Sequence, residues 1–379
     1  MVNDGELIRV VHVVPTLGMG GTEKNGVRLA RFLDSHERFE NRVISVFSGD
    51  ERMRESFEGI TKHSITVLPP KRLHRLREFY RAIKIIRPGA VVFHFFNVDQ
   101  SLLAMMARWA GAKRIVAAAG TAATDLSVAD RLKWIASLSL NRITDTPIIS
   151  ASHWIEKSLK DLGRLPARSR VVYNGIDLQK FAAFRGLESG SKARSSTWTL
   201  GMIARLEGAK DHAAVMRGFR RFADLVPEAV AELRVIGDGP LRQNLEDLAI
   251  ELKLSDRISF LGTRMDVPEQ LAELDTFVFA TTRREGFGNV LVEALAAGVP
   301  VIANDVPSSK EVLRNGDFGE LVPGSDADAW GQVLARRWRD HSFAQVPNVA
   351  ELEDLYGISQ FCGGYLDVLG FRIGREDYR

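Results

Sequence analysis

The sequence predicts an α/β protein made of two doubly wound halves, and three observations support this. The chain has 379 residues, which is too long for one compact core. Short apolar runs alternate with helical patterns, as in parallel sheets whose crossover connections are helices. A stretch rich in Gly, Ser, Lys and Arg, from Arg185 to Ser196, separates two such series. We therefore expect two domains joined near this stretch.

The composition is that of a soluble globular protein. Hydrophobic residues make up 45% and charged residues 26% of the chain. The net charge of +3 is too small for a dedicated nucleic-acid binder, so we expect no nucleic-acid partner. A single cysteine, Cys362, rules out an internal disulfide and a thiolate metal site and fits a reducing cytoplasm.

The N-terminal residues do not resemble a secretion signal. Asp4 and Glu6 stand where a signal peptide needs positive charge. No apolar run approaches the roughly 18 residues that span a bilayer. We expect a cytoplasmic protein whose membrane contact is at most peripheral, on the inner face.

The first half opens with a buried strand, Ile8 to Thr16, followed by a glycine loop, Leu17 to Glu23. Such a loop presents backbone N–H groups to phosphate. A dinucleotide fingerprint would need a glycine where Glu23 stands, and a phosphate P-loop would need a G-K-[ST] sequence that is absent. The alternative interpretation is a tight turn that needs positive φ.

Further strands follow at intervals that leave room for helices. In the first half they are Arg42–Phe47, Ser64–Leu68, Ala90–Phe96, Arg114–Ala119, Pro147–Ala151 and Arg170–Tyr173. In the second half they are Leu200–Ala204, Leu233–Gly237, Ile258–Gly262, Phe277–Ala280 and Val299–Ala303. Two such halves imply a cleft lined by the carboxyl ends of both sheets. We place the domains at 1–177 and 178–350, with a helical tail at 351–379 that packs back on the first.

The stretch from Glu285 to Glu293 joins a strand to a helix. The apolar run Thr276 to Ala280 precedes it, and a helical pattern follows until Gly298. Glu285 therefore lies in the turn and Glu293 in the first turns of the helix. The alternative is an ordinary junction with two solvated glutamates, because the spacing alone is weakly specific.

Two glycines in this turn, Gly286 and Gly288, allow a ligand to approach the backbone closely. The N–H groups of Phe287, Gly288 and Asn289 would then face the ligand at the positive end of the helix dipole. Such a turn suits a phosphate or a hydroxyl-rich sugar.

Several motifs recur in one order along the second half. They are Arg205, Lys210-Asp211-His212, Gly237-Asp238-Gly239-Pro240, Phe260-Leu261-Gly262, Glu285 to Glu293 and Gly298 to Asp305. Together with Gly20-Gly21-Thr22-Glu23 and Asn174-Gly175-Ile176-Asp177, this set resembles the retaining glycosyltransferases of family 4. That family has the GT-B fold, in which two Rossmann-like domains face each other across a cleft. The resemblance covers nearly the whole chain and is strongest from Val171 to Val322.

The resemblance implies transfer of a sugar, with retained stereochemistry, from a nucleotide-sugar donor to a glycan, lipid-linked or small-molecule acceptor. A UDP-sugar is the favoured donor, and neither a cofactor nor a metal is expected. The leaving diphosphate would draw the proton from an acceptor that attacks on the same face. Double displacement by two carboxylates stays an alternative course.

The same resemblance assigns the site residues. Arg205 and Lys210 would stabilise the diphosphate, Glu285 would hold the donor sugar and Glu293 the ribose. The further donor-binding residues are Gly20, Gly21, Arg264 beside the base, Phe287, Gly288 and Asn289. The alternatives are a surface ion pair for the two cations and ordinary strand ends for the glycine motifs.

Many family members have a histidine where this chain has Ala119-Gly120. His94 is a candidate replacement for its contact with sugar or phosphate, and a packed strand-end histidine is the alternative. His153 and His212 have the same standing, and no spacing of ligands suggests a metal site.

The segment from Lys71 to Arg87 is basic and has apolar residues at helical spacing. Its seven basic residues are Lys71, Arg72, Arg75, Arg77, Arg81, Lys84 and Arg87. Such a helix can lie on an anionic membrane and meet a lipid-linked acceptor there. The alternative is a solvated helix whose apolar stripe packs into the core.

Two other functions remain open. A hydrolysing nucleotide-sugar epimerase of the same fold would give a product of inverted stereochemistry without an acceptor. A non-catalytic sugar-nucleotide binder is opposed by the intact Glu285, Arg205 and Lys210. A dinucleotide oxidoreductase is opposed by Glu23.

Overall fold

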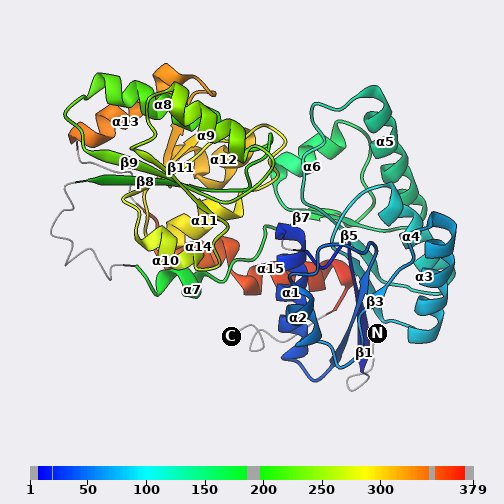
Figure 1. Cartoon of the computed structure of the whole chain (residues 1–379). Coiled ribbons are helices and arrows are strands. Elements are labelled where there is room, and N and C mark those ends of the chain that lie inside the picture. Colours follow the sequence, from blue (N-terminus) through cyan, green and yellow to red (C-terminus); the bar gives the residue numbers. More distant parts are fainter. Residues whose placement is uncertain (1–6, 19, 186–196, 341–345, 372–379) are drawn as a thin grey trace. The chain divides into compact units, whose positions relative to one another are not determined.

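The computed structural model describes residues 7–18, 20–185, 197–340 and 346–371. Residues 1–6, most of the stretch from Arg185 to Ser196 and the chain after residue 371 lie outside the described residues. The chain divides into two compact units (Figure 1). Unit 1 comprises residues 1–175 and 358–379, and unit 2 comprises residues 176–357.

The described part of unit 1 contains a seven-stranded parallel sheet in the order β3-β2-β1-β4-β5-β6-β7. Its strands are β1 (Ile8–Val14), β2 (Phe39–Ser45), β3 (Thr66–Val67), β4 (Ala90–Phe93), β5 (Ile115–Ala119), β6 (Ile148–Ser150) and β7 (Arg170–Val171). Its helices are α1 (Gly21–Asp34), α2 (Arg54–Glu58), α3 (Arg72–Ile86), α4 (Val98–Trp109), α5 (Val128–Ile143), α6 (His153–Lys160) and α15 (Ile358–Leu369). The register of β1 and β2 runs from Ile8 opposite Phe39 to Val14 opposite Ser45.

Side-chain caps fix where several of these helices begin. Asn97, Ser127 and Ser152 each accept a hydrogen bond from a backbone N–H in the first turn of α4, α5 and α6. The first strand ends at Val14, short of the expected Thr16, because Pro15 has no N–H to continue the ladder.

The described part of unit 2 contains a six-stranded parallel sheet in the order β10-β9-β8-β11-β12-β13. Its strands are β8 (Trp198–Ile203), β9 (Ala231–Ile236), β10 (Ile258–Gly262), β11 (Thr276–Phe279), β12 (Val301–Asn304) and β13 (Glu320–Val322). Its helices are α7 (Leu178–Ala182), α8 (His212–Leu225), α9 (Arg242–Glu251), α10 (Val267–Ala272), α11 (Asn289–Ala296), α12 (Pro307–Val312), α13 (Ala327–Asp340) and α14 (Val349–Tyr356), with a 3₁₀ turn at Arg314–Gly316. Both sheets are doubly wound, which confirms the predicted fold class.

The divisions between the units lie at 175/176 and 357/358, against the expected 177/178 and 350/351. The chain passes between the units at these two points, and residues next to them are hydrogen-bonded. Ile176 N donates to the carbonyl of Tyr356 at 2.8 Å. The region of the expected helical tail contains two helices. Helix α14 belongs to unit 2, and α15 belongs to unit 1.

Helix α15 completes the core of unit 1, where it lies beside α1 (Figure 1). Its inward side chains are Phe361, Cys362, Tyr365, Leu366, Val368 and Leu369, all at most 3% exposed. They pack with residues of β1, β4, β5 and β6. A segment from the end of the chain therefore covers a sheet built from its beginning.

Candidate active site

The candidate site of unit 2 lies where its strand order reverses. Strands β8 and β11 are neighbours in the sheet, while the chain continues from β8 outward to β9 and from β11 outward to β12. Loops at the carboxyl ends of such strands diverge and leave room for a ligand. The loops after β8 and β11 carry Arg205, Lys210 and Glu285, and Asn304 ends β12.

Lys210 and Glu285 form a mostly buried ion pair at this point. Lys210 Nζ contacts Glu285 Oε2 directly, and the two side chains are 18% and 14% exposed. The pair is positioned by backbone bonds between the two loops. Asp211 N donates to the carbonyl of Ala280 at 3.0 Å, and Thr282 N donates to that of Ala209 at 3.1 Å.

Thr281 and Asn304 form hydrogen bonds that hold the loops of Lys210 and Glu285 in place. Thr281 Oγ1 donates to the carbonyl of Ala209 at 2.7 Å and lies 3.4 Å from Glu285 Oε2. The Asn304 side chain accepts from Thr281 N at 3.0 Å and donates to the Thr281 carbonyl at 2.7 Å. Two buried polar side chains thus fix the turn that carries Glu285.

The surroundings of Lys210 act on its charge. Burial lowers the pKa of Lys210 to about 8 and nearby Arg205 lowers it as well, while the Glu207 carboxylate opposes both effects. The ammonium group is therefore charged at neutral pH, and the contact with Glu285 favours the same form.

Arg205 lies on the surface of the same loop. Its side chain is 73% exposed, and its Nη2 lies 3.1 Å from Glu207 Oε2. Gly237 allows this loop to approach the end of β9, since a Cβ there would lie 1.9 Å from the Ala204 carbonyl oxygen. Leu206 N donates to the Asp238 carbonyl at 3.0 Å. Gly237 thus has a packing role.

The turn into α11 has the expected glycine geometry. Gly288, the N-cap residue, has φ of +87°. The Phe287 side chain is only 2% exposed and packs edge-on against Tyr356, with ring centroids 5.6 Å apart. Only the backbone of Phe287 is therefore placed to meet a ligand. Glu293, within α11, is partly exposed and has no ion pair with any other described residue.

In unit 1, the glycine loop precedes α1, with Gly20 as N-cap and Gly21 as the first helical residue. The carboxylate of Glu23 folds back over it. A Cβ on Gly20 would lie 2.5 Å from Glu23 Oε2, and Thr16 Oγ1 donates to Glu23 Oε1 at 3.2 Å. Burial raises the pKa of this carboxyl group. A carboxylate of the chain itself therefore covers the loop that was expected to hold phosphate.

Comparison with known families covers most of both units. The family described as Glycosyltransferase Family 4 matches residues 19–180, and that described as Glycosyl transferases group 1 matches residues 188–345. The structure of Anabaena Alr3699/HepE in complex with UDP-glucose superposes with a TM-score of 0.79. At 17% identity over 96% of this chain and 99% of that one, this likeness shows the fold. Both halves of the chain thus match models of glycosyltransferase families, and the chain has the GT-B fold.

Curated relatives of this chain match over part of their length. The N-acetyl-alpha-D-glucosaminyl L-malate synthase of Bacillus anthracis is 28% identical over 59% of this chain and 58% of its own. The UDP-Gal:alpha-D-GlcNAc-diphosphoundecaprenol alpha-1,3-galactosyltransferase of Escherichia coli is 27% identical over 53% of this chain and 57% of its own. The chain thus spans just over half the length of these two relatives.

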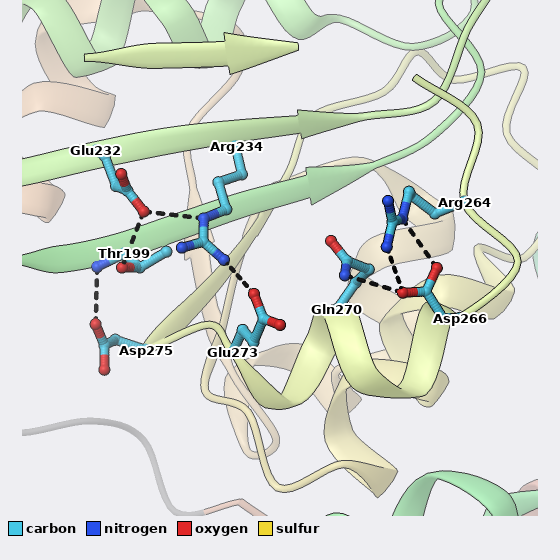
Figure 2. A network of polar contacts seen from close by, with 8 residues as sticks. All are labelled: Thr199, Glu232, Arg234, Arg264, Asp266, Gln270, Glu273 and Asp275. Atoms are coloured by element: carbon cyan, nitrogen blue, oxygen red, sulfur yellow. Dashed lines mark hydrogen bonds and ion pairs between the residues drawn. The ribbon is translucent and has the colours of Figure 1, made fainter. Parts of the chain in front are cut away.

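Arg264 is held by its own neighbours in sequence (Figure 2). Its Nε and Nη2 donate to the two oxygens of Asp266 at 2.9 and 2.6 Å, and Gln270 Nε2 donates to Asp266 at 3.2 Å. The guanidinium group therefore has a fixed direction at the carboxyl end of β10. A second set in Figure 2, around Arg234, joins the amino ends of neighbouring strands and lies apart from the site residues.

His94 lies in the core of unit 1. It is 3% exposed, and its Nε2 lies 3.1 Å from Nδ1 of the fully buried His12. This position favours the packed strand-end histidine over a ligand contact. His212 is 1% exposed and caps its own loop through Nδ1, 3.3 Å from the Lys210 carbonyl, while the ring of His153 packs against Tyr173.

Within the described residues, no group of three or more His, Cys, Asp or Glu side chains is placed to hold a metal ion. Nor does that part of the chain include a helix long and apolar enough to cross a membrane.

Sequence reasoning did not identify Glu207, Thr281, Asn304 or the fold-back of Glu23. Thr281 and Asn304 share one signal that could have found them: each is a polar residue at the carboxyl end of a buried parallel strand. Glu207 and Glu23 had no such signal, because their partners are set by loop geometry.

Proposed function

We propose that this chain transfers a sugar from a nucleotide-sugar donor to a glycan, lipid-linked or small-molecule acceptor, with retention of stereochemistry. The observation that carries the proposal is the buried Lys210–Glu285 pair at the reversal of strand order in unit 2. It sets a cation for a leaving diphosphate beside a carboxylate for sugar hydroxyls. A UDP-sugar is the favoured donor, supported by the UDP-glucose and UDP-Gal in the names of two similar proteins.

In the proposed reaction, the bond between the anomeric carbon and the diphosphate oxygen breaks, and its electron pair leaves with the diphosphate. The acceptor hydroxyl oxygen bonds to the same face of the anomeric carbon, and its proton passes to a phosphate oxygen. Lys210 and Arg205 stabilise the growing negative charge, and the backbone N–H group of Gly288 assists them. No metal is required by this scheme.

Binding of the donor would fix its three parts separately. Glu285 accepts hydrogen bonds from the sugar hydroxyls and Glu293 from those of the ribose. Arg264, which is hydrogen-bonded to Asp266, would contact the base. In this role Glu285 orients the sugar rather than attacking it; an enzyme-bound sugar on Glu285 would instead favour double displacement.

A thermal-shift screen against UDP, GDP, ADP and dTDP in the presence of a chelator tests the donor class. We expect one nucleotide, UDP, to raise the melting temperature by linkage, and Glu293→Ala to reduce the shift. The matched control is Glu251→Ala, an exposed glutamate at the end of α9, which should leave the shift unchanged. If no nucleotide shifts the wild type, the proposed transferase activity loses its basis.

We further propose that the acceptor is met at an anionic membrane surface through α3 to α5 of unit 1. Helix α3 buries Phe79, Ile83 and also Arg75, while its other basic residues face solvent. Six exposed large apolar side chains accompany them on these helices: Leu73, Ile85, Trp109, Val128, Leu132 and Ile143. Basic and apolar groups together suit an anionic lipid surface, at about 1 kcal/mol for each basic residue.

Vesicle co-sedimentation tests this surface. The wild type should sediment with vesicles containing phosphatidylglycerol and not with neutral vesicles. Arg77→Glu with Lys84→Glu should reduce sedimentation, whereas Arg217→Glu with Lys180→Glu, two exposed basic residues of unit 2, should not. Equal binding to both kinds of vesicle would contradict the proposal.

A further inference from the structure

Lys210 and Glu285 satisfy each other. Their contact is direct, and both side chains are mostly buried, so each charge depends on the other. The nearby cation Arg205 is exposed and lies against Glu207. The two ion pairs thus leave the site close to neutral where the proposed function needs a free cation.

The proposed donor makes two demands on this pair at once. A diphosphate must take Lys210 Nζ, which leaves Glu285 as a buried carboxylate beside the incoming negative charge. Thr281 Oγ1 is at best a weak hydrogen-bond donor to Glu285, because it lies 3.4 Å from Oε2 and already donates to the Ala209 carbonyl at 2.7 Å. New hydrogen-bond donors must replace Lys210, and the sugar hydroxyls of the donor are such groups.

We propose that the Lys210–Glu285 pair makes the site discriminate the sugar-bearing donor from its nucleoside diphosphate product. An intact donor brings hydroxyl groups to Glu285 as its diphosphate takes Lys210. After transfer the product has no hydroxyl for Glu285, so the carboxylate repels the diphosphate and recovers Lys210. The pair therefore favours product release. This inference rests on the proposed function.

The inference predicts that a mutation of a proposed site residue tightens binding. Titration calorimetry with UDP should give about tenfold tighter binding by Glu285→Gln than by the wild type, the order of magnitude expected for removing one like-charge contact. Lys210→Met should weaken UDP binding, and Glu285→Gln should tighten it less in the Lys210→Met background than in the wild type, because Glu285 acts partly by holding Lys210.

A matched control separates release of Lys210 from a general loss of negative charge. Glu207 lowers the local potential in the same way but pairs with Arg205 instead of touching Lys210 Nζ. Glu207→Gln should therefore tighten UDP binding much less than Glu285→Gln. Equal tightening by both variants would overturn the inference.

A second measurement uses the wild type alone and does not depend on whether Glu285→Gln folds. D-glucose, D-galactose or N-acetylglucosamine at high concentration should tighten UDP binding, because a free sugar can occupy Glu285 and the coupling is reciprocal. If none of these sugars changes UDP binding and Glu285→Gln binds UDP no tighter than the wild type, the inference is wrong while nucleotide binding stands. If the wild type binds no nucleotide at all, the proposed function itself fails.

Discussion

A buried series of hydrogen bonds runs from the Ala30 carbonyl through Asn41 and His12 to His94. The Ala30 carbonyl determines which atoms in this series carry protons. Asn41 Nδ2 donates to the Ala30 carbonyl at 2.9 Å, so Asn41 Oδ1 faces His12 Nε2 at 3.0 Å and must accept. His12 therefore carries its proton on Nε2 and accepts at Nδ1 from His94 Nε2. Burial lowers the pKa of His12 to about 4 and that of His94 well below its usual value.

These histidines make stability depend on pH. The folded pKa of His12 lies below the unfolded value of about 6.5, so its stabilising effect is full above pH 6.5 and is lost between pH 6.5 and 4. The free energy of unfolding should fall by about 3 kcal/mol from this group across that window. Chemical denaturation at several pH values should show a shallower fall in His12→Gln. His74→Gln, at an exposed site, should keep the wild-type slope.

At the scale of elements, apolar runs located most strands because parallel strands buried on both faces are continuous in hydrophobicity. Strand β4 (Ala90–Phe93) is an example, all of it buried. Strand β13 was missed, since Glu320–Val322 is three residues long and only Val322 is buried. Strand β2 begins at Phe39, earlier than expected, because its start alternates buried and half-buried residues.

Site residues that belong to a sequence motif could be predicted. Contacts between residues from different loops could not, because they depend on the order of strands in the sheet. Lys210 and Glu285 were named from the sequence, but their pairing depends on β8 and β11 being neighbours, which no local pattern states. Asn304 joins the site only because β12 lies next to β11. Residue roles in the proposed reaction remain predictions that the experiments above test.

At the scale of the whole molecule, unit 2 is inserted between two segments of unit 1. The second segment supplies α15, whose Phe361 lies against Gly175, where a Cβ would come within 2.7 Å. Without α15, one face of the unit 1 sheet loses its cover of buried apolar side chains. Unit 2 has its own sheet and core and does not include these residues.

Truncation after Gly357 should therefore unfold unit 1 and leave unit 2 folded. Limited proteolysis should remove residues 1–175 quickly, while a fragment near residues 176–357 persists. Truncation after Phe371 is the control, because it keeps all of α15 and should digest like the full chain. Equal resistance of both units after the first truncation would show that α15 is dispensable.

Because α15 belongs to unit 1, the order of translation determines when each unit can complete its fold on the ribosome. The sheet strands of unit 1 are translated first, but their covering helix is made only after the whole of unit 2. At about 5–20 residues per second, the nascent sheet waits roughly ten to forty seconds with an apolar face open. Unit 2 is complete in sequence before unit 1, so the nascent chain is most exposed to aggregation and chaperones at its older end.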